Sequence, residues 1–134
     1  MSSSGWSGAR EWREKANRIA PTIVGGSKKH GGPDLGPTRS RKAWECLGVD
    51  GSLIAYDPPT SDFIGMPRLT VRMASILQGF PIDWEFVGKK TPAYRQVGNA
   101  FPPPVAKAVG EAIKEAITVA ITTKDEHDLE RGVA

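Results

Sequence analysis

The residues best suited to hold a ligand lie in "RQVGNAFPPPVAKAVG", residues 95–110, where a short polar stretch, Gly98-Asn99-Ala100, comes just before three prolines. Proline is tolerated in the first turn of a helix and holds the residue before it in extended backbone. Glycine permits a tight bend, and the Asn99 amide can both donate and accept hydrogen bonds. The pattern predicts either a structural turn that caps the helix, or a site where backbone N–H groups and Asn99 hold an anionic or polar group.

A second candidate is the glycine-rich segment "GGSKKHGGPDLGPTR", residues 25–39. From Lys28 to Lys42 the chain has five basic residues against one acid, Asp34. Glycines let a backbone approach bases and phosphates closely, and Lys and Arg neutralise phosphate. The segment is therefore expected to be either a solvated surface loop or a contact with nucleic acid.

Cysteine and metal chemistry are not expected. The single cysteine, Cys46 in "AWECLG", excludes an internal disulfide, and on a predicted helix it is expected to be a small packed apolar residue. His30 and His127 lack the spacing of metal ligands. The 134 residues carry a net charge of +3 and no apolar run of membrane-spanning length, and no apolar stretch follows the first ten residues. We expect a cytoplasmic protein with no membrane partner and no metal.

The elements that would position these residues are short. Helices are predicted over residues 7–20, with Ser7 as the cap, and over residues 39–48, ended by Gly48. A short strand is predicted in "PTIVGG", residues 21–26, and an Asp-Gly turn at residues 50–51.

Periodicity is clearer in the second half. Thr70 is predicted to cap a helix that ends at Gly79, with an apolar face at i, i+3, i+4 and i+7 spacing formed by Met73, Ile76, Leu77 and Phe80. Residues 82–101 are predicted to connect this helix to the next. The last helix is predicted from about Pro103 to about Ile121, with apolar positions at Val105, Val109, Ala112, Ile113, Ala116, Ile117 and Ala120. A polar tail follows.

Two stretches in order, "RLTVRMASILQGFPIDW" and "YRQVGNAFPPPVAKAVG", closely resemble the last two motifs of the DNA cytosine-5 methyltransferases. The family patterns are L-T-x-R-E-x-A-x-L-Q-G-F-P and Y-x-Q-x-G-N-A-V-P-P-x-V-A. The resemblance covers residues 68–110, about a third of the chain. Met73 stands where the family usually has a glutamate, which would have completed a capping box with Thr70.

The resemblance implies roles for both candidates. Asn99 and Ala100 would line the pocket for S-adenosylmethionine, and the helix after the prolines would pack on the cofactor domain. "PTIVGGSKKHGG" is similar to the family's variable DNA-recognition region, a T-[ILV] strand followed by a glycine-rich loop. The residues expected to contact DNA are Thr22, Gly25, Gly26, Ser27, Lys28, Lys29, His30, Gly31, Gly32, Arg39 and Arg41.

The catalytic motifs of the family are absent from this sequence. Its reaction needs a thiolate that attacks C6 of a flipped cytosine, and the family carries this thiol in P-C-Q. Cys46 has neither that proline nor that glutamine beside it, and the E-N-V and Q-x-R-x-R motifs are also missing. We therefore expect no catalytic residue in the chain.

These observations together predict the C-terminal portion of a DNA cytosine-5 methyltransferase, inactive alone. It would bind duplex DNA and share S-adenosylmethionine with a separate catalytic-core chain, as part of a restriction-modification system. Two origins stay open, the small subunit of a split enzyme and a truncated gene product. The alternatives are a stand-alone DNA-binding module and an inert remnant.

The expected fold is α+β, a small target-recognition-type domain with short strands and long loops. A C-terminal helix would follow it and pack on a Rossmann-like methyltransferase core absent from this chain. The expected organisation is a DNA-recognition region over residues 1–67, the two motifs and the last helix over residues 68–122, and a polar tail over residues 123–134.

Overall fold

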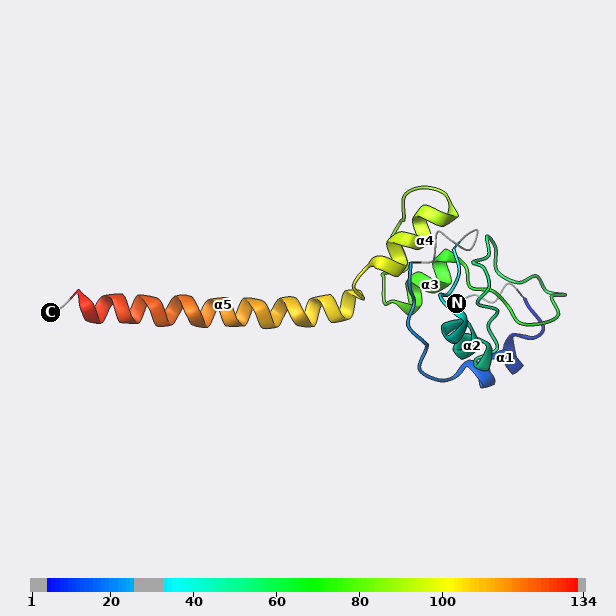
Figure 1. The fold of residues 1–134 in the computed structure, drawn as a ribbon, viewed down its shortest axis with the longest axis horizontal. Coiled ribbons are helices and arrows are strands. Elements are labelled where there is room, and N and C mark those ends of the chain that lie inside the picture. Colours follow the sequence, from blue (N-terminus) through cyan, green and yellow to red (C-terminus); the bar gives the residue numbers. More distant parts are fainter. Residues whose placement is uncertain (1–4, 26–32, 133–134) are drawn as a thin grey trace. The chain divides into compact units, whose positions relative to one another are not determined.

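The structure, a computed structural model, describes residues 5–25 and 33–132, without the side chains of residues 125–130. The chain divides into two compact units, Met1–Ala100 and Phe101–Ala134. The helices of the described residues, in chain order, are α1 (Ala9–Ala16), α2 (Thr38–Cys46), α3 (Val71–Leu77), α4 (Lys90–Asn99) and α5 (Pro103–Arg131) (Figure 1).

The predicted short strands are not confirmed. Within the described residues, β pairing is limited to one parallel bridge between Ala55 and Thr70. Residues 21–25, predicted as a strand, have no regular secondary structure. An isolated strand needs neighbours to complete its hydrogen bonds, and this segment is instead held by burial of Ile23, which is 7% exposed. The described part of the chain is helix-rich.

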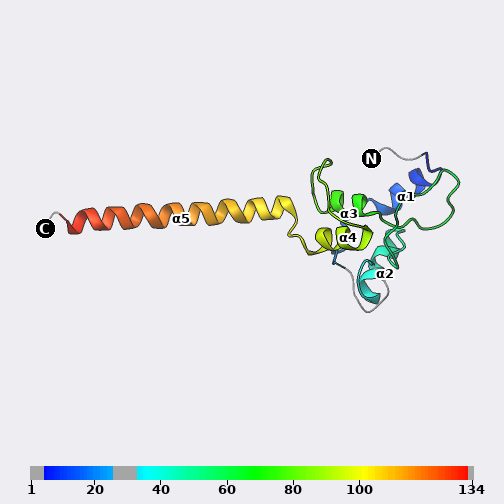
Figure 2. The ribbon, with the colours of Figure 1, turned by 90° about the horizontal axis from the view of Figure 1, so that it is seen from above.

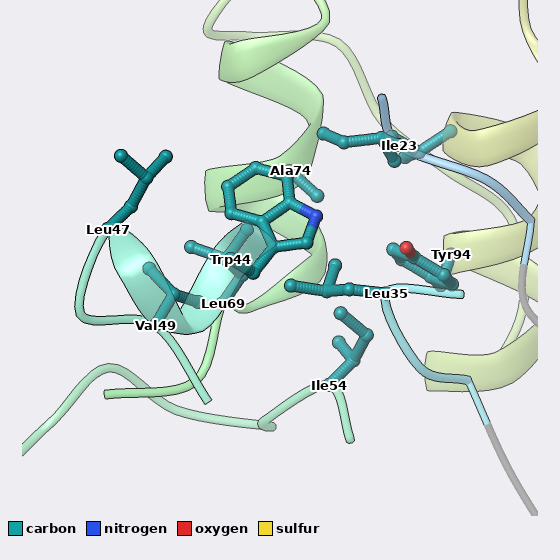
Figure 3. Packing of buried hydrophobic residues seen from close by; sticks show 10 residues of the cluster. Ile23, Leu35, Trp44, Leu47, Val49, Ile54, Leu69, Ala74 and Tyr94 are labelled. Carbon is teal, nitrogen blue, oxygen red and sulfur yellow. The ribbon is translucent and has the colours of Figure 1, made fainter. Parts of the chain in front are cut away.

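One apolar cluster holds the first unit together (Figure 3). Trp44 of α2 and Tyr94 of α4 are its largest fully buried side chains, at 2% and 0% exposure. The other buried members are Ile23, Leu35, Leu47, Val49, Ile54, Leu69, Ala74 and Val97. The cluster therefore joins the segment around Ile23 and α2 to the α3–α4 pair that contains the two family-like motifs.

The start of α3 confirms the predicted cap. The Met73 backbone N–H donates to Thr70 Oγ1 at 3.1 Å, which satisfies one of the donors that a helix leaves free at its first turn. The predicted apolar face is buried only in part, because Met73 packs against the cluster while Ile76 and Phe80 are half-buried. Ala74 and Ser75 are fully buried, whereas Leu77 is 46% exposed. Small side chains are buried here because α3 packs closely against α4, and the two helices lie side by side in both views (Figure 2).

The turn before α3 is held by an ion pair at the surface. Arg68 Nε donates to Asp50 Oδ2 at 2.7 Å, and the Asp50 N–H donates to the Pro67 carbonyl oxygen at 3.0 Å. The Ser52 N–H donates to Asp50 Oδ1 at 2.9 Å, which is the expected Asp-Gly turn. Burial acts to raise the pKa of Asp50, but the hydrogen bonds from Ser52 and the Arg68 guanidinium outweigh it and keep the pKa below its usual value.

Helices α1, α4 and α5 differ from the prediction. Ser7 does not cap α1, because Gly8 occupies the N-cap position and Ser7 Oγ donates instead to the Ser61 carbonyl oxygen. Helix α4 lies inside the stretch predicted as a connection. Helix α5 begins at Pro103 as predicted but continues to Arg131. No helix in the described residues is long and apolar enough to cross a membrane.

Candidate functional site

The polar stretch at residues 98–100 is the end of a helix and not a free turn. Gly98 and Asn99 are the last two residues of α4, and Ala100 is its C-cap in extended backbone. The Ala100 N–H donates to the Gln96 carbonyl oxygen at 3.1 Å. Tyr94 and Val97 turn inward to the apolar cluster, at 0% exposure each. Helix α4 therefore has a buried face, which holds it against the core, and an exposed end, where Asn99 lies.

A side-chain hydrogen bond connects the two motifs. Gln78, the glutamine of "LQGF", donates from Nε2 to the Val97 carbonyl oxygen at 3.2 Å. Gln96 in turn donates from Nε2 to the Val87 carbonyl oxygen at 2.7 Å and so holds the preceding loop against α4. These two bonds fix the last turn of α4, the turn that carries Gly98 and Asn99.

The Asn99 side chain is exposed at the end of α4, and no hydrogen bond to its amide is present within the part of the chain that the structure describes. Its oxygen can accept from an ammonium group and its nitrogen can donate to a carboxylate. S-adenosylmethionine carries both groups on its methionine part. Asn99 and the half-buried Ala100 therefore fit a role in holding this cofactor, the role that the resemblance implies.

Only part of the predicted DNA-contacting set falls on described residues. Gly26, Ser27, Lys28, Lys29, His30, Gly31 and Gly32 lie outside them. Thr22 is exposed, while its neighbour Ile23 is buried in the cluster with Tyr94 and Val97. Gly25 lies directly against Asn99, because a Cβ atom built on Gly25 would overlap Asn99 Oδ1 and lie 3.0 Å from Asn99 Cγ. The structure thus brings the start of the glycine-rich segment to the candidate cofactor residue.

The two arginines of the predicted set lie on α2. Arg39 is exposed, whereas Arg41 is half-buried and donates from Nη2 to Thr38 Oγ1 at 3.5 Å. Arg39 therefore has the more accessible guanidinium group of the two.

Asp34 and Tyr94 are buried polar residues near the far end of the glycine-rich segment. Asp34 is 1% exposed, and its Oδ1 accepts from the Gly36 N–H at 3.0 Å. Burial, assisted by the negative charge of Asp34, raises the pKa of Tyr94 above its ordinary value. Tyr94 is fully buried, and its role is to pack the core.

Cys46 differs from its prediction in one respect. It is exposed at the end of α2, not packed. Helix α2 turns Trp44 into the core, at 2% exposure, and Cys46, two residues further on, comes to lie on the outer side.

Sequence reasoning missed the close approach of Gly25 to Gly98. A Cβ atom built on Gly98 would lie 2.5 Å from Gly25 Cα and from the Val24 carbonyl carbon. A glycine inside a helix costs about 1 kcal/mol relative to alanine, so Gly98 would have indicated close packing only if α4 had been predicted as a helix. Nothing in the sequence indicates which segment packs there.

Comparison with known proteins places this chain in a family. The model of the C-5 cytosine-specific DNA methylases matches residues 9–115. Type II methyltransferase M.NaeI of Lentzea aerocolonigenes is 54% identical over 122 residues, which cover 89% of this chain and 30% of that protein. Type II methyltransferase M.NgoMIV of Neisseria gonorrhoeae is 48% identical over 120 residues, which cover 87% of this chain and 38% of that protein.

Type II methyltransferase M.AquIB of Picosynechococcus sp. is 42% identical over 67 residues, which cover 42% of this chain and 48% of that protein. No solved structure matches the chain significantly. The protein belongs to the C-5 cytosine-specific DNA methylase family, as its two motifs predicted. It spans about a third of the length of the first two of these relatives.

Proposed function

We propose that this chain is the DNA-recognition and cofactor-pocket-completing part of a DNA cytosine-5 methyltransferase. In this proposal it works with a separate catalytic core that carries the P-C-Q nucleophile. The observation that carries the proposal is the end of α4, where Asn99 is exposed and Gly25, the first residue of the glycine-rich segment, lies against it. One rigid unit would thus hold a wall of the cofactor pocket and the base of the DNA-contacting segment.

The exposed face of α5 supports a partner core. Val105, Val109, Ile113 and Ile117 recur every four residues and are 47%, 44%, 55% and 55% exposed. A single helix has no means of burying its own apolar face, and packing such a face against another element removes apolar surface from water. By the resemblance, this helix would pack on the surface of the cofactor domain. The motifs of that domain are absent from the 134 residues.

The proposal gives the candidate residues specific roles in binding the cofactor and DNA. Asn99 and Ala100 would bind the methionine part of S-adenosylmethionine, which supplies the methyl group when bound. Lys28, Lys29 and Arg39 would neutralise DNA phosphates, and the glycines would let the backbone approach the duplex. The attacking thiolate would come from the core, since Cys46 lacks the surrounding motif.

Reconstitution of methyl transfer tests this proposal. The chain would be mixed with a family core that carries P-C-Q but lacks the two C-terminal motifs, and transfer of a radiolabelled methyl group to DNA would be measured. We expect no transfer by either protein alone and transfer by the mixture. Methylation by the 134-residue chain alone, or a core that is fully active without it, would overturn the proposal.

DNA binding by the chain is a second, independent measurement. Replacing Lys28 and Lys29 with alanine should weaken binding to all DNA sequences, and should reduce the steepness of the salt dependence by about one unit for each phosphate that is no longer neutralised. Asn99→Ala is the matched control, because it should leave DNA binding unchanged while lowering methyl transfer by the mixture. If Asn99→Ala leaves methyl transfer by the mixture unchanged, Asn99 takes no part in the cofactor pocket. DNA binding by the chain together with a mixture that transfers no methyl group would instead show a stand-alone DNA-binding module.

A further inference from the structure

The backbone of residues 24–25 packs directly against the α-carbon of Gly98. A Cβ atom at Gly98 would overlap the Gly25 backbone nitrogen and would lie 2.5 Å from both Gly25 Cα and the Val24 carbonyl carbon. Ordinary van der Waals contact begins at about 3.4 Å. Two stretches of main chain that are 73 residues apart in sequence are therefore in direct contact, with no side chain between them.

The same contact limits the position of the Asn99 amide. A Cβ atom at Gly25 would overlap Asn99 Oδ1 and would also lie 3.0 Å from Asn99 Cγ and 3.5 Å from Asn99 Nδ2. All three outer atoms of this amide lie close to the open side of Gly25. Because Gly25 carries only a hydrogen atom in place of a side chain, the space beside its Cα is free for the Asn99 amide.

The segment that carries Gly25 has little freedom to move away. Ile23 is buried in the cluster with Tyr94 and Val97, both on α4. Val24, which lies between Ile23 and Gly25, packs against a second glycine, because a Cβ atom at Gly36 would lie 2.9 Å from Val24 Cγ2. Because Ile23 and Val24 are held on both sides, Gly25 is a fixed support for the Asn99 side chain.

We propose that Gly25, from the DNA-recognition region, is a positioning residue for the methyl donor, and that it acts by holding the Asn99 amide in its binding orientation. The inference rests on the proposed function, in which Asn99 binds S-adenosylmethionine. It adds that a residue outside the two motifs determines how well the donor binds. A side chain at Gly25 displaces the amide and weakens donor binding while the fold stays intact, because only the end of the Asn99 side chain has to move.

Steady-state kinetics of the reconstituted enzyme tests the inference, with Gly25→Ala as the variant. The KM for S-adenosylmethionine should rise about tenfold, because the loss of one hydrogen bond to a charged group weakens binding by roughly this factor. The kcat at saturating donor should change much less. In an Asn99→Ala background, Gly25→Ala should have no further effect on the donor KM, since the group through which it acts is gone.

Gly51→Ala is a matched control. A Cβ atom at Gly51 would lie 3.3 Å from Arg41 Cγ and from Leu35 Cβ, so this glycine is also crowded but does not face Asn99. This variant should leave the donor KM unchanged. A donor KM that stays within twofold of the wild type in Gly25→Ala, or that rises equally in Gly51→Ala, would overturn the inference. So would equal effects of Gly25→Ala with and without Asn99.

A measurement on the chain alone separates this inference from the proposed function. The NMR signals of the Asn99 side-chain amide should shift in Gly25→Ala and not in Gly51→Ala. Unshifted signals in Gly25→Ala would overturn the inference even if the mixture methylates DNA normally. Shifted signals together with a wild-type mixture that transfers no methyl group would instead overturn the proposed function, and with it the role of Gly25 in donor binding.

Discussion

Replacing Gly98 with alanine sets two physical effects against each other, and the structure indicates which one is larger. Gly98 lies in the last turn of α4, where alanine should gain about 1 kcal/mol from helix propensity alone. Against this gain, the new methyl group would lie 2.5 Å from two main-chain carbon atoms of residues 24–25. These atoms would have to move by almost 1 Å to reach ordinary contact at 3.4 Å.

The cost of that movement is the larger effect. Overpacking typically costs about 1–3 kcal/mol, and we expect the upper part of that range because main chain is harder to displace than a flexible side chain. Moving residues 24–25 would also disturb Ile23, which is packed against Tyr94 and Val97. The expected net loss of unfolding free energy is about 2 kcal/mol, or a fall in Tm of roughly 10 °C for a unit of this size.

Urea unfolding followed by tryptophan fluorescence measures this loss directly. All four tryptophans of the sequence precede residue 101, so the signal comes from the first unit. Gly110→Ala is the control, because Gly110 also lies in a helix but has no atom within 4 Å of the added Cβ. The control should keep the wild-type midpoint. A midpoint for Gly98→Ala equal to or above that of the wild type, at unchanged m-value, would refute the close contact with residues 24–25.

Three further changes test the electrostatics and capping of the first unit. Tyr94→Phe should leave the unfolding free energy unchanged or slightly higher, since the buried hydroxyl has no hydrogen-bond partner within the described residues; a loss above about 1 kcal/mol in urea unfolding would contradict this. Arg68→Ala should raise the pKa of Asp50 toward 3.8 in an NMR titration and cost less than about 1 kcal/mol at pH 7, because the pair is partly exposed at the surface. Since the folded pKa of Asp50 is lowered, this contribution is complete above about pH 4 and is lost as pH falls through the folded pKa, so wild type and variant should converge in acid unfolding. Thr70→Ala should cost about 1 kcal/mol through the lost bond to the Met73 N–H, and Thr70→Ser should recover most of it; equal stability of all three proteins would show that the cap contributes nothing.

Local signals in the sequence predicted several elements correctly. Thr70 caps α3, Pro103 begins α5, and Gly48 follows the end of α2. Each of these effects acts within one turn of backbone, because a cap needs only its own side chain and proline fixes its own φ. The two motifs identified the family for the same reason, since they are contiguous stretches of sequence.

Other features could not be predicted because they depend on packing partners that are far apart in the sequence. Helix α4 was missed because its proline and glycine resemble a connection, although Pro92 lies in the first turn, where a missing N–H costs little. The buried face of α3 was predicted only in part: Met73 packs against the core, but the close approach of α4 buries Ala74 and Ser75 and leaves Leu77 exposed. The prediction of a strand at residues 21–25 was wrong, because this segment is held by burial of Ile23 and not by pairing with another strand.

The sequence by itself determined the family, the absence of the P-C-Q nucleophile motif from these 134 residues, and the residues to examine for cofactor and DNA contact. Only the tertiary structure decided that Gly25 lies against Gly98 and Asn99. The physical reason is that glycine has no side chain, so its pattern in a sequence shows that something must approach closely but does not show what. Packing of Ile23 beside Tyr94 and Val97 selects the partner, and that packing exists only in the folded chain.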